Sequence, residues 1–227
     1  MDNSTYSTLT RQTGLMREMQ AVANNIANMS TTGFRQEGLI FAEHIAALDG
    51  QPSSSMASAT ARETNQLQGS LKQNNGTFDF AIEGDGFFLL DTPNGERLTR
   101  AGSFMVSPEG ELVNPAGNRV LDAGGAPIFI PPNPEQLGVG TDGTISLDGQ
   151  PLGQLGIYSP DDPASMQRHD GVMFETTDNL VPATGAILQG FVEASNVNPV
   201  LEISRMIEIQ RAYEMGQGFL DKEDERI

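Results

Sequence analysis

NPVLEISRMIEIQRAY, residues 198–213, predicts a helix whose start is well defined. Asn198 is a favourable N-cap, and Pro199 fits the first helical position, which needs no amide donor. A residue before proline is kept out of the α region, which suits the extended backbone of an N-cap. Glu202 falls in the first turn, where the helix dipole favours an anion. We therefore expect the helix to begin at Pro199.

The apolar side chains of this helix cover about half of its circumference. The apolar face holds Val200, Ile203, Met206, Ile207, Ile209, Tyr213 and Leu220, and the other side holds Arg205, Glu208 and Arg211. A face of this width suits burial against more than one neighbouring element. Gly216 and Gly218 lie further along the helix, and each weakens it by about 1 kcal/mol relative to alanine.

A second amphipathic helix is predicted near the N-terminus, over residues 4–28. Its apolar stripe has the alternating spacing of a coiled coil and consists of Leu9, Met16, Met19, Ala23 and Ile26, with Leu15, Val22 and Met29 on an adjoining stripe. The polar face carries Asn24, Asn25 and Asn28, which are neighbours on the helix surface. Ser30-Thr31-Thr32-Gly33 ends the helix.

Two interpretations of these helix faces are open. In the first, the two terminal helices pair only with each other and form a private core. In the second, both helices also contact neighbouring subunits, which explains apolar faces too wide for one seam. The second is favoured because an isolated pair of helices is marginally stable. Asn24, Asn25, Asn28 and Gln210 would then make amide hydrogen bonds between subunits, the alternative being a solvated polar face.

The middle of the chain differs from its ends in composition and charge. Residues 38–190 contain 21 of the 25 glycines and 12 of the 13 prolines, with six basic and nineteen acidic side chains and hence a net charge of −13. Short apolar runs alternate there with turn pairs such as Asp85-Gly86 and Asp148-Gly149, the residue types of tight hairpin turns. So acidic a surface repels nucleic acid and anionic lipid.

We expect an all-β domain in this region. The predicted strands are residues 87–91, 97–100, 104–107, 111–113, 128–130, 144–147, 154–158, 173–175 and 187–193. Residues 38–49 fit a strand or a short helix equally well, and residues 51–61 are typical of a flexible connector. The predicted organisation is α+β, with a helical, coiled-coil-like domain from residues 1–37 and 191–227, a connector over 38–69 and a β-rich outer domain over 70–190.

No catalytic, cofactor-binding or metal-binding constellation stands out. Residues 138–143 (GVGTDG) have the glycine spacing of a dinucleotide site, but a strand and not a helix is predicted after them. His44 and His169 are the only histidines and the chain has no cysteine, so neither a zinc site nor a histidine-dependent triad is supported. Most acidic residues of the middle lie beside turn glycines. We expect no enzymatic activity and no cofactor.

Three motifs follow one another along the chain. They are ANNIAN and TTGFR at residues 23–28 and 31–35, DFAIEGDGFF at 79–88, and SNVN with MIEIQRAYE at 195–198 and 206–214. Together they resemble the signatures of the flagellar rod and hook protein family. The chain length is most similar to that of the proximal rod members. The alternatives are a distal rod subunit or, in a different class, a secreted β-rich enzyme or glycan-binding module.

The resemblance implies a structural subunit of the bacterial flagellar basal-body rod, which assembles helically through its terminal helices and transmits torque. Its implied partners are copies of itself, other rod proteins and the flagellar type III export apparatus, without nucleic acid. The implied location is the periplasmic rod, with no cleaved signal peptide and no membrane insertion. We expect the assembly interface to contain Leu9, Met16, Met19, Asn24, Asn25, Ile26, Asn28, Gly33, Phe34, Asn196, Asn198, Ile203, Met206, Ile207, Gln210, Arg211 and Tyr213.

Overall fold

A computed structural model describes residues 2–46, 54–131 and 136–224 of the chain. The chain divides into two compact units. The terminal unit comprises residues 1–29, 36–66 and 197–227, and the β unit comprises residues 30–35 and 67–196. Two long helices and a strand-rich middle make the fold α+β, as predicted.

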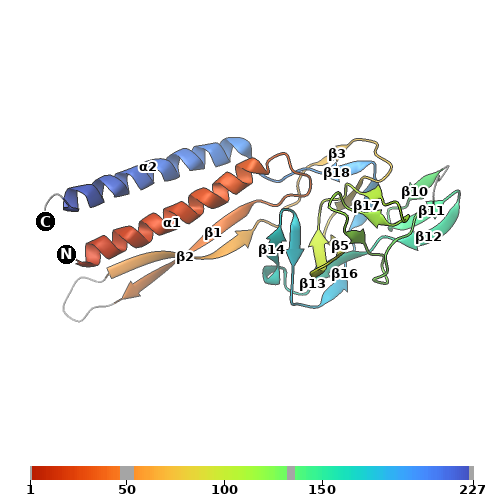
Figure 1. The fold of residues 1–227 in the computed structure, drawn as a ribbon, viewed down its shortest axis with the longest axis horizontal. Helices are drawn as coiled ribbons and strands as arrows, with labels where there is room; N and C mark the ends of the chain where they lie inside the picture. Colours follow the sequence, from red (N-terminus) through yellow and green to blue (C-terminus); the bar gives the residue numbers. More distant parts are fainter. Residues whose placement is uncertain (1, 47–53, 132–135, 225–227) are drawn as a thin grey trace. The chain divides into compact units, whose positions relative to one another are not determined.

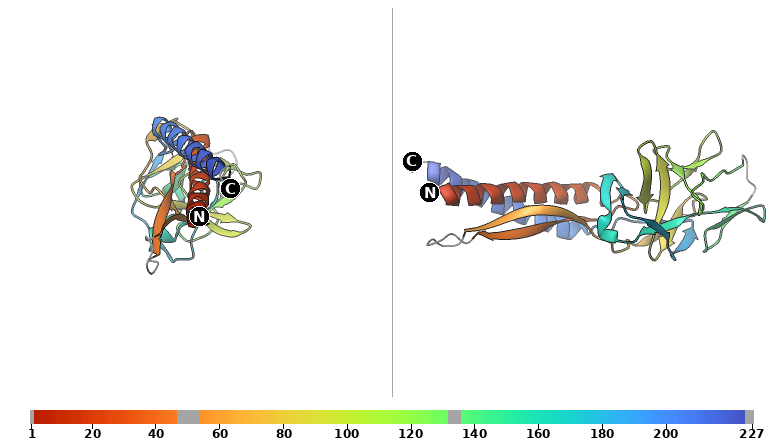
Figure 2. Two further views of the ribbon diagram at one scale, coloured as in Figure 1. Left: turned by 90° about the vertical axis from the view of Figure 1, so that its left-hand side faces the viewer. Right: turned by 90° about the horizontal axis from the view of Figure 1, so that it is seen from below.

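The terminal unit consists of two helices and a β-hairpin. Its elements are α1 (Asp2–Ala27), β1 (Glu37–Ala46), β2 (Ser54–Thr64) and α2 (Pro199–Asp224). The helix α1 packs against α2 and also against both strands of the hairpin, so it lies between them (Figure 1). The other views show the hairpin following α1 along its length (Figure 2).

The prediction of a flexible connector is wrong for residues 54–61, which belong to β2. This strand pairs antiparallel with β1, with a register shift between Ile40 and Phe41. Small side chains such as serine and alanine carry little strand signal locally, and the order of β2 comes from backbone pairing with its neighbour. Residues 37–46 form a strand, which decides between strand and helix there, and residues 51–53 lie outside the described part of the chain.

The start of α2 agrees with the sequence prediction. Pro199 is the first helical residue. The Asn198 side-chain oxygen accepts hydrogen bonds from the backbone amides of Val200 at 3.1 Å and Leu201 at 3.3 Å, so it satisfies two donors that have no partner within the helix.

The β unit is built from antiparallel strands. They are β3 (Leu71–Gln73), β4 (Phe80–Glu83), β5 (Phe87–Thr92), β6 (Gly95–Thr99), β7 (Met105–Val106), β8 (Leu112–Val113), β9 (Arg119–Val120), β10 (Leu137–Val139), β11 (Thr144–Leu147), β12 (Gln150–Gln154), β13 (Ile157–Pro160), β14 (Gln167–Asp170), β15 (Met173–Glu175), β16 (Leu180–Pro182), β17 (Ala186–Gln189) and β18 (Phe191–Glu193), with a 3₁₀ turn at Pro163–Ser165.

The largest sheet has the strand order β14-β15-β6-β5-β9-β8-β7, and β13 joins it by pairing with β5 and β16. A three-stranded sheet, β10-β11-β12, and the pairs β17-β4 and β18-β3 complete the unit. Its main apolar cluster includes Phe80, Phe88, Leu90, Phe104 and Ile187. The rings of Phe88 and Phe104 meet edge to face with centroids 5.4 Å apart, a favourable aromatic geometry.

Most predicted strands are present, with three differences. Residues 128–130 form no regular strand, and among them only Phe129 makes a bridge, with Glu111. The expected strand 187–193 is divided into β17, which pairs with β4, and β18, which pairs with β3. The expected strand 154–158 is divided between the end of β12 and the start of β13. The glycine-rich residues 138–143 connect β10 to β11 as a hairpin, as predicted. Asp148 and Gly149 both have positive φ, 48° and 82°, and form the tight turn between β11 and β12.

Candidate assembly interface

The two helices of the terminal unit are antiparallel and are joined by polar contacts along their length. Gln12 Nε2 donates to the carbonyl oxygen of Tyr213 at 3.0 Å, and Arg205 pairs with Glu18 at 2.8 Å. Asn25 Nδ2 donates to Glu202 Oε2 at 3.0 Å. Because residue numbers rise along α1 as they fall along α2, these contacts fix the register of the pair.

Few apolar side chains are buried in the part of the terminal unit whose side chains are described, residues 8–29, 36–40, 62–66 and 197–221. They are Ala21, Val22, Val197 and Ile209. The β unit, by contrast, contains two buried clusters built around phenylalanine, leucine and isoleucine. Burial of apolar surface is the main stabilising contribution to folding. The described residues of α1 and α2 therefore contribute little of it in a single chain.

Several large apolar side chains remain exposed over a broad part of the α2 surface. These residues are Val200, Leu201, Ile203, Ile207, Met215 and Phe219. Ile203 and Ile207 are one turn apart, on the opposite side of the helix from the buried Ile209. One side of α2 is thus packed within the chain, while the other presents apolar groups to solvent.

The coiled-coil-like stripe predicted for α1 is not the side of the helix that packs within the chain. Leu9 and Met16 are exposed, and Met19 and Ile26 are only half-buried. The adjoining stripe packs instead, because Val22 is buried there. Both helices therefore carry an apolar stripe that a single chain leaves uncovered.

The asparagines of α1, predicted to bond between subunits or else to form a solvated face, make a network of hydrogen bonds inside the chain. Asn25 is buried, and its Nδ2 donates to the Glu37 carbonyl oxygen at 2.8 Å as well as to Glu202. Its Oδ1 accepts from the Glu37 amide at 2.9 Å. Asn24 donates to Glu37 Oε2 at 3.3 Å, and Asn28 donates to the Asn24 carbonyl oxygen at 2.9 Å.

Glu202 is a central residue of this network that the sequence prediction underestimated. Its carboxylate is only 2% exposed and also accepts from Gln36 Nε2 at 2.7 Å. From the sequence, the position of Glu202 in the first turn of α2 predicted only a favourable interaction with the helix dipole. In the structure this one side chain joins the start of α2 to α1 and to the start of the hairpin.

Gly33 and Phe34, both predicted interface residues, are buried within the β unit. A Cβ at Gly33 would lie 2.3 Å from the Ala101 amide nitrogen, and the φ of Gly33 is +71°. The Arg168 guanidinium lies over the Phe34 ring at 4.4 Å. Asn196 donates to the Leu67 carbonyl oxygen at 2.7 Å. The TTGFR motif therefore contributes to the β unit in this chain.

A buried charge cluster follows Phe34. Arg35 and Arg100 both pair with Glu193, at 3.0 and 3.2 Å, and all three side chains are at most 4% exposed. Arg100 also donates to the carbonyl oxygen of Gly84 at 2.7 Å. Burial lowers the pKa of Arg35 to about 10, and the Glu193 carboxylate opposes that shift. Sequence analysis missed this cluster because its members are far apart in the chain.

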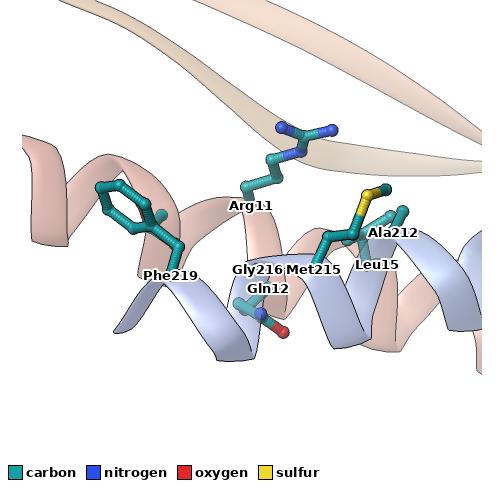
Figure 3. A pocket seen from close by; sticks show the side chains of 8 residues that line it. Arg11, Gln12, Leu15, Ala212, Met215, Gly216 and Phe219 are labelled. Carbon is teal, nitrogen blue, oxygen red and sulfur yellow. The ribbon is translucent and has the colours of Figure 1, made fainter. Parts of the chain in front are cut away.

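Two grooves lie between α1 and α2. The first, of about 360 Å³, is lined by Thr8, Arg11, Gln12, Leu15, Ala212, Met215, Gly216 and Phe219 (Figure 3). The second, of about 590 Å³, is lined by Leu15, Glu18, Leu201, Ser204, Arg205, Glu208, Ile209 and Ala212. Gly216 permits the close approach of the helices at the first groove, because a Cβ there would lie 2.4 Å from Gln12 Nε2.

The two glycines of α2 provide a matched pair of substitutions. Gly218→Ala should raise the stability of the helix by about 0.5–1 kcal/mol, since a Cβ there meets nothing within 4 Å. Gly216→Ala should show no such gain, because the new methyl group displaces Gln12 and its hydrogen bond to Tyr213, a loss of about 1 kcal/mol. Thermal unfolding followed by circular dichroism at 222 nm measures both; equal gains would contradict the close approach.

The remaining predicted interface residues lie on α2 or just before it. Gln210 and Arg211 are exposed, Met206 and Tyr213 are half-buried, and Asn198 is exposed as the N-cap. No helix in the described part of the chain is long and apolar enough to span a lipid bilayer.

Comparison with known proteins gives three family matches along the chain. Residues 7–35 match "Flagella basal body rod protein", residues 81–147 match "Flagellar hook protein FlgE/F/G D1 domain", and residues 188–227 match "Flagellar basal body rod FlgEFG protein C-terminal". They cover the same segments as the sequence motifs.

Individual relatives are similar over nearly the full chain. The flagellar basal-body rod protein FlgF of Caulobacter vibrioides is 42% identical over 97% of this chain and 93% of its own length. The FlgF of Mesorhizobium japonicum is 40% identical over 94% of this chain and 90% of its own length. The flagellar basal-body rod protein FlgG of Bacillus subtilis is 30% identical over 99% of this chain and 96% of its own length.

Proposed function

Because the chain belongs to the family of flagellar basal-body rod proteins, we propose that it assembles with copies of itself and with other rod subunits through the exposed apolar faces of α1 and α2. Like its family it is a structural subunit of the rod and not an enzyme. The observation that carries the proposal is the exposure of Ile203 and Ile207 on the side of α2 that faces away from the buried Ile209.

The thin core of the terminal unit supports this interface. Subunit contacts that cover the stripes of α1 and α2 would add apolar burial of about 25 cal/mol per Å². We expect coiled-coil-like packing across subunits, in which Leu9, Met16 and Met19 take part together with the exposed residues of α2. The interface would then supply the stabilisation that the terminal unit lacks as a monomer.

The contact surfaces that we propose on neighbouring subunits are different from one another. Such heterologous contacts propagate as an open helix when the rotation between subunits does not close a ring. A rod built in this way transmits torque along its axis. The greater similarity to FlgF relatives than to FlgG relatives favours a proximal position in the rod, and a distal, FlgG-like position is the second candidate.

The route to the rod is also part of the proposal. We expect the chain to leave the cell through the flagellar type III export apparatus, without a cleaved signal peptide, and to assemble in the periplasm. The absence of cysteine suits a chain that folds outside the cytoplasm without forming stray disulfides.

Ile207→Asp tests the interface. The side chain is 44% exposed in the single chain, so the carboxylate is tolerated by the monomer but becomes buried and unpaired on assembly. We expect incorporation into basal bodies to fall roughly tenfold or more, with loss of motility, since a desolvated polar group costs several kcal/mol. Quantitative immunoblots of isolated basal bodies and swimming assays measure this.

Leu152→Asp is the matched control. Leu152 is 41% exposed and lies in the β unit, so the same change at the same exposure leaves the terminal helices untouched. We expect it to be incorporated like the unmodified chain. Normal rods and motility with Ile207→Asp would contradict the assignment of α2 to the interface.

A further inference from the structure

The groove lined by Arg11, Leu15, Met215 and Phe219 is incomplete in a single chain. We call it the inter-helix groove; Gln12 and Gly216 also line it (Figure 3). Gln12 is 9% exposed, and its Oε1 has no hydrogen-bond partner among the described residues, although its Nε2 is bonded to Tyr213. A buried acceptor without a donor is costly. The groove thus combines exposed apolar surface, an unsatisfied acceptor and a guanidinium.

A surface with matching chemistry lies on α2. We call it the α2 stripe, and it consists of Ile203, Ile207, Gln210 and Glu214, all of which are exposed. At 100° per residue these positions fall within about 60° of one another on the helix. The stripe therefore presents apolar groups followed by an amide and a carboxylate.

Only a second copy can bring these two surfaces together. The α2 residues of the inter-helix groove are turned away from the stripe around the helix, Met215 by about 110° and Phe219 by about 150° from the centre of the stripe. We infer that the inter-helix groove of one subunit receives the α2 stripe of another, an inference that rests on the proposed function. Glu214 of the incoming helix then lies near Arg11.

Charge selects this pairing over the other apolar surfaces of the terminal unit. The exposed stripe of α1 around Leu9 and Met16 has Thr13 and Gln20 as its polar members, so it offers no carboxylate to Arg11. The second groove between the helices contains Glu208 and an already paired Glu18 and Arg205. It would repel Glu214. Arg11 is the one charged residue that lines the inter-helix groove, so this groove can accept Glu214 of the α2 stripe.

Cysteine crosslinking tests the contact, since the chain has no cysteine of its own. Met215→Cys and Ile207→Cys chains carrying different epitope tags are produced together in the bacterium that encodes this protein, and isolated basal bodies are treated with a short thiol-specific crosslinker. We expect a doubly tagged dimer. A mixture of Leu152→Cys and Ile207→Cys chains is the control, because Leu152 is 41% exposed in the β unit and does not line the groove; its dimer yield should be at least fivefold lower.

Charge reversal adds a second measurement on the same mixture. Arg11→Glu in every chain, or Glu214→Arg in every chain, should lower the dimer yield severalfold, and the two together should restore it. Glu109→Arg, at an exposed turn of the β unit, should leave the yield unchanged.

The outcomes separate the two proposals. Tagged chains that enter basal bodies but give no more dimer than the Leu152 control would overturn the groove pairing and leave the rod assignment standing. The same holds if the charge reversals fail to compensate each other. Absence of the tagged chains from basal bodies, where the unmodified tagged chain is also absent, would overturn both.

Discussion

Glu193→Ala is expected to destabilise the β unit by about 3–5 kcal/mol, the effect of removing one partner from a buried ion cluster. The substitution leaves Arg35 and Arg100 buried without their shared carboxylate, and it also removes the acceptor for the Gly69 amide at 3.0 Å. Hydrogen–deuterium exchange in peptides covering β4 and β5 should accelerate by roughly a hundredfold or more, because exchange from the core reports local stability.

Asp91→Ala is the control for this change. Asp91 pairs with Arg119 at 2.7 Å, and the two side chains are 34% and 46% exposed, so the loss should stay below about 1 kcal/mol. Glu193→Gln should fall between the two, because it keeps an acceptor for Gly69 while removing the charge. Equal effects of the substitutions at 193 and 91 would show that the cluster contributes no more than a surface ion pair.

Asn25→Ala is expected to destabilise the terminal unit by about 2–4 kcal/mol. The Glu37 amide and one oxygen of the Glu202 carboxylate each lose their hydrogen bond with Asn25 while remaining buried, and each such group costs about 1–3 kcal/mol. The start of α2 should detach first. Exchange in peptides covering residues 199–213 measures the loss, and motility should fall with it.

Asn28→Ala supplies the comparison, three residues further along the chain. Asn28 is half-buried and donates to the Asn24 carbonyl oxygen and side chain, so the expected loss is below about 1 kcal/mol. A destabilisation by Asn28→Ala as large as that by Asn25→Ala would contradict the central place of Asn25 in the network.

Features encoded by neighbouring residues were predicted from the sequence. Asn198 and Pro199 define the start of α2 because capping depends on residues within one turn. The turn at Asp148-Gly149 was predictable because positive φ is a local property of those residue types. The α+β organisation followed from the same kind of signal.

Features that depend on partners distant in the sequence were not predicted. Asn25 and Glu202 are 177 positions apart, and Gln36 and Glu202 are 166 apart, so periodicity described their helices but not their contact. The asparagines of α1 lie on a polar face, and a network of buried amides leaves no pattern in the sequence of a single helix. The sequence therefore predicted hydrogen bonds to other subunits and not the hydrogen bonds inside the chain. The strand β2 was missed for a related reason, since its order comes from pairing with β1.

In both units, residues near the N-terminus need partners that lie near the C-terminus and are synthesised much later. Arg35 needs Glu193, and Asn25 needs Glu202. A ribosome-bound chain therefore cannot complete the core of either unit until its final segment has emerged, and closing such long loops slows folding. During synthesis the chain therefore passes through an interval in an open state, and a truncation that removes residues 193–227 would leave it in that state.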